Sequence, residues 1–67
     1  MNVSAARLID VKEVSRLTSL GRSTIHRMLD RGKFPKPITL SDAKRTVWLE
    51  SEVTSWIEQQ VEAARAR

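Results

Sequence analysis

The sequence of 67 residues contains no cysteine and a single histidine. Without cysteine the chain has no disulfide scaffold and no thiolate metal site, and one histidine cannot form a zinc centre by itself. No serine, histidine and acidic residue are spaced in a way that suggests catalysis, and a chain this short has little room for an active-site cleft. We therefore expect no enzyme, no metal and no cofactor.

Long apolar runs are also lacking. No stretch approaches the roughly 20 residues that a membrane-spanning helix needs, and the N-terminus lacks the apolar core of a signal peptide. The chain has no internal repeat and no low-complexity segment. We therefore expect one cytoplasmic domain over residues 1–67, with no membrane partner.

Acidic residues are scarce in the middle of the chain. Residues 22–45 carry seven lysines and arginines against two aspartates, a net charge of +5. Residues 49–67 carry four glutamates against two arginines, a net charge of −2, and the whole chain carries +4. A basic middle beside a mildly acidic end favours a face that binds a polyanion over charge spread evenly for solubility.

The centre of the basic region predicts a helix over about residues 22–31 with two different faces. Ile25, Met28 and Leu29 recur at i, i+3 and i+4, the spacing of one buried stripe. At about 100° per residue, the other side of this helix carries polar and mostly cationic side chains. These are Ser23, Arg27 and Asp30, with Arg22, Thr24 and His26 on the flanks. Such a helix suits the major groove of DNA, and taken alone it equally fits an amphipathic helix with a solvated face.

A second short helix is predicted before it, over about residues 10–18. Asp10 followed by Glu13 is typical of a capping box, in which each side chain binds a free backbone N–H of the other residue. The segment Thr18–Gly21, with Leu20 as its apolar plug, then has the length of the turn in a helix-turn-helix.

The cationic helix is flanked by a glycine at each end. Gly21 is expected at its N-cap, where glycine is acceptable although a little weaker than serine. Gly32 is expected at its C-terminal end, in the left-handed conformation that closes many helices.

A small hairpin is predicted over about residues 38–48. The two prolines of Phe34-Pro35-Lys36-Pro37 enforce an extended path, and Phe34 is expected to anchor it to the core. Residues 38–40 and 46–48 are β-branched and aromatic runs, joined by a polar and basic tip at residues 41–45. A two-stranded ribbon is marginal alone and needs a helix to lie on; beside a helix-turn-helix it is called a wing.

The last helix is predicted over about residues 50–65. Its apolar residues follow at spacings that place them all on one face toward the core. They are Val53, Trp56, Ile57, Val61 and Ala64. We expect Trp48 and Trp56 to pack in the core rather than to form stacking platforms for a single strand. The fold class expected from these elements is mainly α with a small β-hairpin, a winged helix-turn-helix. Residues 1–9 form a short lead-in.

The succession of these segments resembles the AlpA family, which comprises short regulators of prophages and genomic islands. That family is similar to phage excisionases and to the winged-helix part of MerR regulators, although this chain lacks the long coiled coil of MerR. The likeness covers roughly Leu8 to Ile57, and its most specific parts are FPKP at residues 34–37 and W-L-x-S-E-V-x-x-W from Trp48. Two departures are Gly21, where the family more often has serine, and His26, where it often has tyrosine.

The resemblance implies a sequence-specific protein that binds double-stranded DNA at the nucleoid. It would act as a transcriptional regulator or as an excisionase that directs recombination, with an integrase or further copies of itself as partners on DNA. The candidate DNA contacts are Arg22, Ser23, Thr24, His26 and Arg27 on the helix, Lys33 and Lys36 beside the wing, and Lys44 and Arg45 at the wing tip.

A different class of function stays open at this stage. The chain can also be a small adaptor or antirepressor whose basic face binds an acidic protein. The mixed charges on the outer face of the last helix, Glu58, Glu62 and Arg65, suit either that role or contacts to a recombinase. Each candidate contact likewise has a plain alternative, a solvated helix face or the ordinary polarity of a turn.

Overall fold

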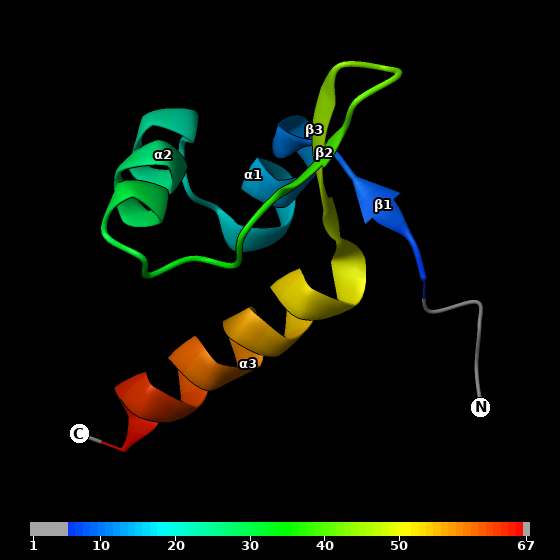
Figure 1. Ribbon diagram of the computed structural model, residues 1–67. Helices are drawn as coiled ribbons and strands as arrows, with labels where there is room; N and C mark the ends of the chain where they lie inside the picture. Colours follow the sequence, from blue (N-terminus) through cyan, green and yellow to red (C-terminus); the bar gives the residue numbers. More distant parts are fainter. Residues whose placement is uncertain (1–5, 67) are drawn as a thin grey trace.

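The computed structural model describes residues 6–66, which form three helices packed against a small antiparallel sheet (Figure 1). Residues 1–5 of the expected lead-in lie outside the described residues. In chain order the elements are β1 (Leu8–Ile9), α1 (Val11–Thr18), α2 (Arg22–Asp30), β2 (Ile38–Leu40), β3 (Arg45–Leu49) and α3 (Glu50–Arg65). The predicted fold class, mainly α with a small β-hairpin, is confirmed, and the arrangement is compatible with a winged helix-turn-helix.

Helix α1 begins at the predicted cap, but only half of the capping box forms. The backbone N–H of Glu13 donates to Oδ1 of Asp10 at 3.0 Å. The Glu13 carboxylate accepts a bond from Nε of Arg16 at 3.0 Å instead of returning one to the backbone of Asp10. The reciprocal bond was therefore a wrong expectation, because a charge-assisted bond to an arginine one turn along the helix is the stronger alternative.

The two glycines beside α2 take the conformations that the sequence predicts. Gly21 is the N-cap, with an extended backbone at φ −72° and ψ 162° and no capping side chain. Gly32 has a φ of 69°, the left-handed region in which glycine is favoured. The Gly32 N–H donates to the carbonyl of Leu29 at 3.0 Å, and the Lys33 N–H donates to that of Met28 at 2.8 Å. This pair of bonds is the Schellman arrangement, which satisfies the last carbonyls of the helix.

The sheet has three strands rather than the two that the hairpin pattern predicts. Its order is β1-β3-β2, with β3 pairing antiparallel to both neighbours. Strand β1 pairs Leu8 with Leu49 and Ile9 with Trp48. The predicted hairpin of β2 and β3 is therefore present, and β1 is an addition that the sequence did not predict. A strand of two residues is too short to leave an alternating pattern in the sequence. The extra strand adds backbone pairing to a hairpin that would be only marginally stable alone.

Phe34 and the two tryptophans hold the core together. The Phe34 ring lies edge-on to Trp48, with centroids 6.3 Å apart, and tilted against Trp56 at 4.7 Å. Trp48 is 1% exposed, and both indole N–H groups donate to backbone carbonyls. The prediction that the tryptophans are packing residues is confirmed. The buried cluster that they join consists of Ile9, Val14, Ile25, Phe34, Trp48 and Val53.

Helix α3 covers this core only with its first half. Val53 is fully buried, and Trp56 and Ile57 are half-buried. Val61 is 43% exposed and Ala64 is exposed as well, so the expectation that these two help to cover the core was wrong. The core cluster ends on α3 with Val53, Trp56 and Ile57, and the helix runs on from there toward the C-terminus (Figure 1). Within residues 6–66, no helix is both long and apolar enough to cross a membrane.

Candidate nucleic-acid interface

Helix α2 presents a polar and largely cationic face to solvent. Ile25 is fully buried against α1 and the core, and Met28 and Leu29 are half-buried beside it. The predicted outer face is exposed, apart from Thr24, which is half-buried on the edge of the helix. The exposed side chains are Arg22, Ser23, His26, Arg27 and Asp30.

Side-chain hydrogen bonds fix the turn that sets the direction of α2. Ser15 Oγ donates to the backbone carbonyl of Leu20 at 2.6 Å. Thr18 Oγ1 donates to the carbonyl of Val14 at 2.8 Å and accepts the Leu20 N–H at 3.3 Å. These bonds and the burial of Ile25 hold the exposed face of α2 in one orientation relative to α1, and a fixed orientation is what a groove-reading helix requires.

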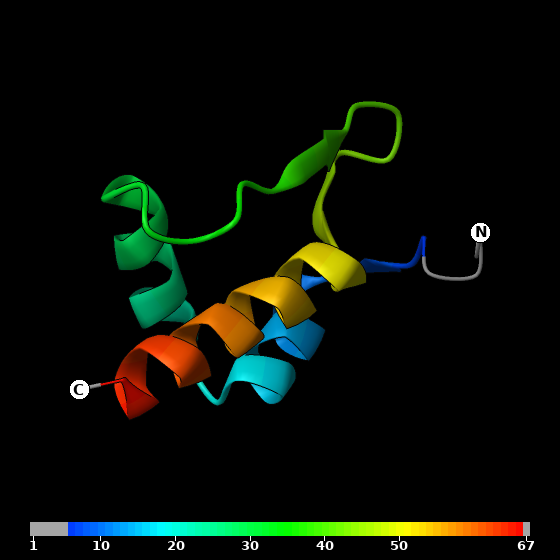
Figure 2. The same ribbon diagram turned by 90° about the horizontal axis from the view of Figure 1, so that it is seen from below.

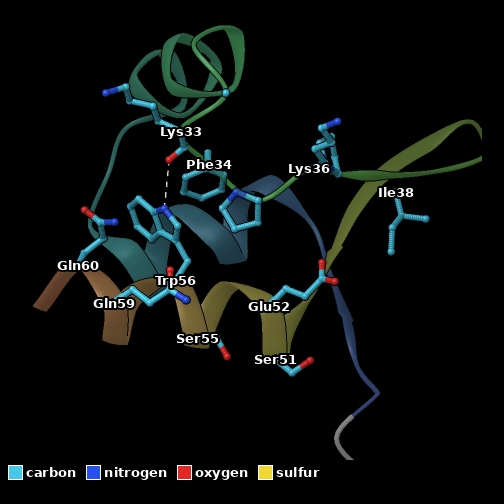
Figure 3. A pocket seen from close by; sticks show the side chains of 13 residues that line it. Lys33, Phe34, Lys36, Ile38, Ser51, Glu52, Ser55, Trp56, Gln59 and Gln60 are labelled. Atoms are coloured by element: carbon cyan, nitrogen blue, oxygen red, sulfur yellow. Dashed lines mark hydrogen bonds between the residues drawn. The ribbon is translucent and has the colours of Figure 1, made fainter. Parts of the chain in front are cut away.

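The segment between α2 and the hairpin is pinned by the two tryptophans. The Trp56 indole donates to the Lys33 carbonyl at 3.1 Å, and the Trp48 indole donates to the Pro35 carbonyl at 2.9 Å. Figure 3 shows the first of these bonds and the Lys33 and Lys36 side chains pointing away from α3. Two cationic side chains are therefore carried on a backbone that is held in place.

The hairpin separates the two residues that the sequence places together at its tip. Lys44 lies in the turn, with a φ of 52°, an uncommon value for a residue other than glycine. Arg45 is the first residue of β3 instead, paired with Leu40 in the sheet. Its Nη2 lies 3.4 Å from Oδ2 of Asp10. The placement of Arg45 at the tip was therefore wrong, because strand pairing begins one residue earlier than expected.

The structure brings most of the candidate residues onto three consecutive parts of the chain: α2, the segment to β2, and the hairpin. In Figure 1 α2 and the hairpin tip lie toward the upper edge, and in both views the C-terminal end of α3 lies at the lower left, far from the tip (Figures 1 and 2). Two acidic residues, Asp30 at the end of α2 and Asp42 in the turn, lie among the cations. The candidate interface is thus a discontinuous cationic surface with one helix and one hairpin tip as its projecting parts.

Sequence reasoning did not single out two exposed hydroxyl-bearing residues of the hairpin. Thr39 and Thr46 pair across β2 and β3, and both are exposed. In the sequence they counted only as β-branched residues that favour strands. Their hydroxyl groups can donate hydrogen bonds to phosphates, and the alternation of Thr39 with the half-buried Ile38 and Leu40 was the signal of an outward-facing side chain.

Among residues 6–66 no group of three histidine, cysteine, aspartate or glutamate side chains is placed to hold a metal ion. The groove in Figure 3, between the segment from Gly32 to Ile38 and α3, is lined mainly by serine, glutamine, proline and lysine side chains around Trp56.

Comparison with known proteins places these features in a family. The family described as prophage CP4-57 regulatory protein (AlpA) matches residues 7–61. The uncharacterized protein ORF88 of Enterobacteria phage P4 is 39% identical over 56 residues, which are 84% of this chain and 62% of the relative. The chain therefore spans less than two thirds of the length of that relative. No solved structure matches the chain.

Proposed function

The chain belongs to the AlpA family of prophage regulatory proteins, and from this premise we propose that it binds double-stranded DNA sequence-specifically through α2 and the hairpin. In this proposal α2 enters the major groove with its exposed face toward the bases. The hairpin contacts the backbone beside that groove. The residues proposed as contacts are Arg22, Ser23, Thr24, His26, Arg27, Lys33, Lys36, Lys44 and Arg45.

The exposed face of α2 is the observation that carries the proposal. A helix with its side chains is about 10–12 Å across, and the major groove of B-DNA is about 12 Å wide. Arg27 lies at the centre of the exposed face, opposite the buried Ile25. A guanidinium there can pair bidentately with guanine O6 and N7, the commonest specific contact that proteins make with bases.

The cations beyond α2 are assigned to the phosphates. Lys33 and Lys36 point away from α3 (Figure 3). Lys44 lies in the turn of the hairpin and is exposed. Ammonium groups act as point charges, which suit phosphates more than base edges. They would fix the register of α2 on the duplex without adding sequence information.

Bound at its site, the protein would regulate transcription or direct the excision of the genetic element that carries it. The printed description of the family names a regulatory protein and supports the first of these uses. The second use would bring an integrase to the same DNA. Both uses start from the same complex of α2 with DNA, so the complex itself is the step to test.

The test is selection of duplexes from a random-sequence library, followed by titration of the selected DNA at several salt concentrations. We expect an enriched motif and a logarithm of affinity that falls with the logarithm of salt by about 0.9 for each neutralised phosphate. No enrichment, or an affinity that does not change with salt, would contradict the proposal. In that case an adaptor that binds an acidic protein through the same basic face would be the better account.

A further inference from the structure

The second half of α3 is a helix that the rest of the described chain leaves uncovered. Of its 16 residues only Val53 is fully buried. Residues 58–66 are all exposed. Helices this short gain most of their stability in water from packing of an apolar face, so two uncovered turns are marginal on their own.

Val61 is the centre of an apolar surface on this half of α3. It is 43% exposed and lies between two shallow hollows. One hollow runs along α3 itself, from Ile57 past Val61 to Arg65. The other lies between α3 and the helix-turn-helix, where its apolar lining also includes Leu17, Leu20, Met28 and Trp56.

The charges around Val61 have a self-complementary order. At about 100° per residue, Glu58 and Arg65 lie on one flank of Val61, while Ile57 and Ala64 lie on the other. Glu58 is three residues before Val61 and Arg65 is four residues after it. Beside Val61, one flank is therefore acidic at one end and basic at the other, and the opposite flank is apolar. Glu62 and Gln60 lie farther out on these two sides, each about 100° from Val61.

These two charges are not used inside the described chain. The ion pairs found among residues 6–66 join Arg7 with Glu50, Arg16 with Glu13, and Arg45 with Asp10. Glu58 and Arg65 thus remain available to a partner.

We propose that this face of α3 pairs antiparallel with the same face of a second copy of the chain, about a two-fold axis at Val61. Such an axis keeps each flank on its own side and reverses the direction of the helix. It brings Glu58 of one copy beside Arg65 of the other, twice by symmetry. On the other flank it packs Ile57 against Ala64 of the second copy.

The contact is small, which determines when it forms. A stable interface buries about 800 Å² on each partner, more than two turns of one helix can supply. The pairing is therefore weak between free molecules and becomes strong when two copies are held close together, as on neighbouring DNA sites. The C-terminal end of α3 points away from the hairpin tip in both ribbon views, so the pairing leaves the hairpin tip free (Figures 1 and 2).

The first test uses charge exchange without DNA. Glu58→Arg makes both ends of the charged flank basic, and Arg65→Glu makes both ends acidic. Two copies of the same variant would therefore place like charges together, so neither variant pairs with itself. Mixed together they are complementary at both positions. Isotope-labelled Arg65→Glu is titrated with unlabelled Glu58→Arg to about 1 mM, a concentration that detects dissociation constants in the millimolar range. We expect amide shifts confined to α3 from Ile57 to Arg65, and self-association of the double variant Glu58→Arg/Arg65→Glu like that of the unaltered chain.

Matched variants separate this face from the rest of the helix. Val61→Glu puts a carboxylate at the centre of the contact and should abolish the shifts. Ala63→Glu adds the same charge about 200° around the helix from Val61 and should leave the shifts intact. Both residues are exposed, so neither change should affect folding. Absence of shifts in the mixture, shifts elsewhere on the surface, or equal effects of the two variants would overturn the proposal.

The second test is made on DNA and rests on the proposed function. Two selected sites are placed as inverted or as direct repeats at several spacings, with a single site as the control. A two-fold contact predicts cooperative binding to inverted repeats, lost with Val61→Glu and retained with Ala63→Glu. Unchanged binding to the single site together with independent binding to every pair would overturn the pairing and leave the proposed function standing. Failure to bind even the single site would contradict the proposed function alone, because the experiment without DNA decides the pairing.

Discussion

Nη2 of Arg45 lies 3.4 Å from Oδ2 of Asp10, while Oδ1 of the same carboxylate accepts the backbone N–H of Glu13. One aspartate thus caps α1 and holds the base of the hairpin. The pair is largely exposed, with 57% of the Arg45 side chain and 43% of the Asp10 side chain accessible, so its contribution to stability is small. We expect this pair to have a larger effect on the proposed DNA binding, because Arg45 already faces a negative charge and Lys44 does not share that partner.

Lys44 and Arg45 should therefore contribute unequally to DNA binding. Lys44→Asn removes the charge and keeps a residue that tolerates a positive φ, so we expect the salt slope to fall by about one unit with the fold intact. Arg45→Gln should lower the slope by less. Asp10→Asn, which keeps a good helix cap, should strengthen binding, since it releases Arg45. Salt titrations of the three variants on one duplex measure these effects, and equal slopes for Lys44→Asn and Arg45→Gln would contradict this division.

The two glycines beside α2 should respond in opposite ways to a side chain. Gly21 has a negative φ, and a Cβ there would meet no atom within 4 Å, so Gly21→Ser supplies a capping hydroxyl. We expect a gain of a few tenths of a kcal/mol. Gly32 has a φ of 69°, so Gly32→Ala should destabilise the fold by about 1 kcal/mol despite the open space around it. Denaturant melts decide this, and a clear loss in Gly21→Ser would mean that α2 starts elsewhere.

Glu13 makes the stability of the fold depend slightly on pH in the acidic range. The hydrogen bond from Arg16 lowers the pKa of the Glu13 carboxyl below its ordinary value of 4.5. A lowered pKa in the folded state contributes stability that is fully present above the ordinary value and is lost as the pH falls through the lowered one. We expect the difference in melting temperature between the unaltered chain and Glu13→Gln to be constant near neutral pH and to shrink below pH 4.5. Melting curves from pH 7 to pH 3 test this. A difference in melting temperature that grows as the pH falls would contradict a lowered pKa for Glu13 in the folded state.

Much of the framework could be predicted from the sequence because its signals are local. The stripe of Ile25, Met28 and Leu29, the cap at Asp10 and the glycine at position 32 each act within one or two helical turns. The structure places all three as these patterns indicate. The same holds for the exposed face of α2, since burial of Ile25 on one side leaves Arg27 on the other.

The misses concern contacts between distant parts of the chain. Strand β1 forms because Leu8 and Ile9 pair with β3, some forty residues later in the chain. No local sequence pattern predicts that pairing. The bond between Arg45 and Asp10 likewise joins residues 35 positions apart. Val61 has the spacing of a core residue but lies past the end of a small core. In that case the helical period gave the correct face, and only the size of the domain decided its burial.

The central claim is that α2 reads bases and the hairpin holds phosphates. It is tested most directly by the affinities of Arg27→Ala and Lys44→Asn for the selected duplex and for random DNA, with Arg31→Ala as a control for loss of an arginine near the end of α2. We expect Arg27→Ala to cost about 1–3 kcal/mol on the selected duplex and much less on random DNA. Lys44→Asn should weaken both DNAs alike, and Arg31→Ala, which removes a charge outside the proposed contacts, should affect both DNAs less. All three variants should melt like the unaltered chain because these side chains are exposed. Equal losses of Arg27→Ala on both DNAs, together with altered specificity in Lys44→Asn, would contradict the account.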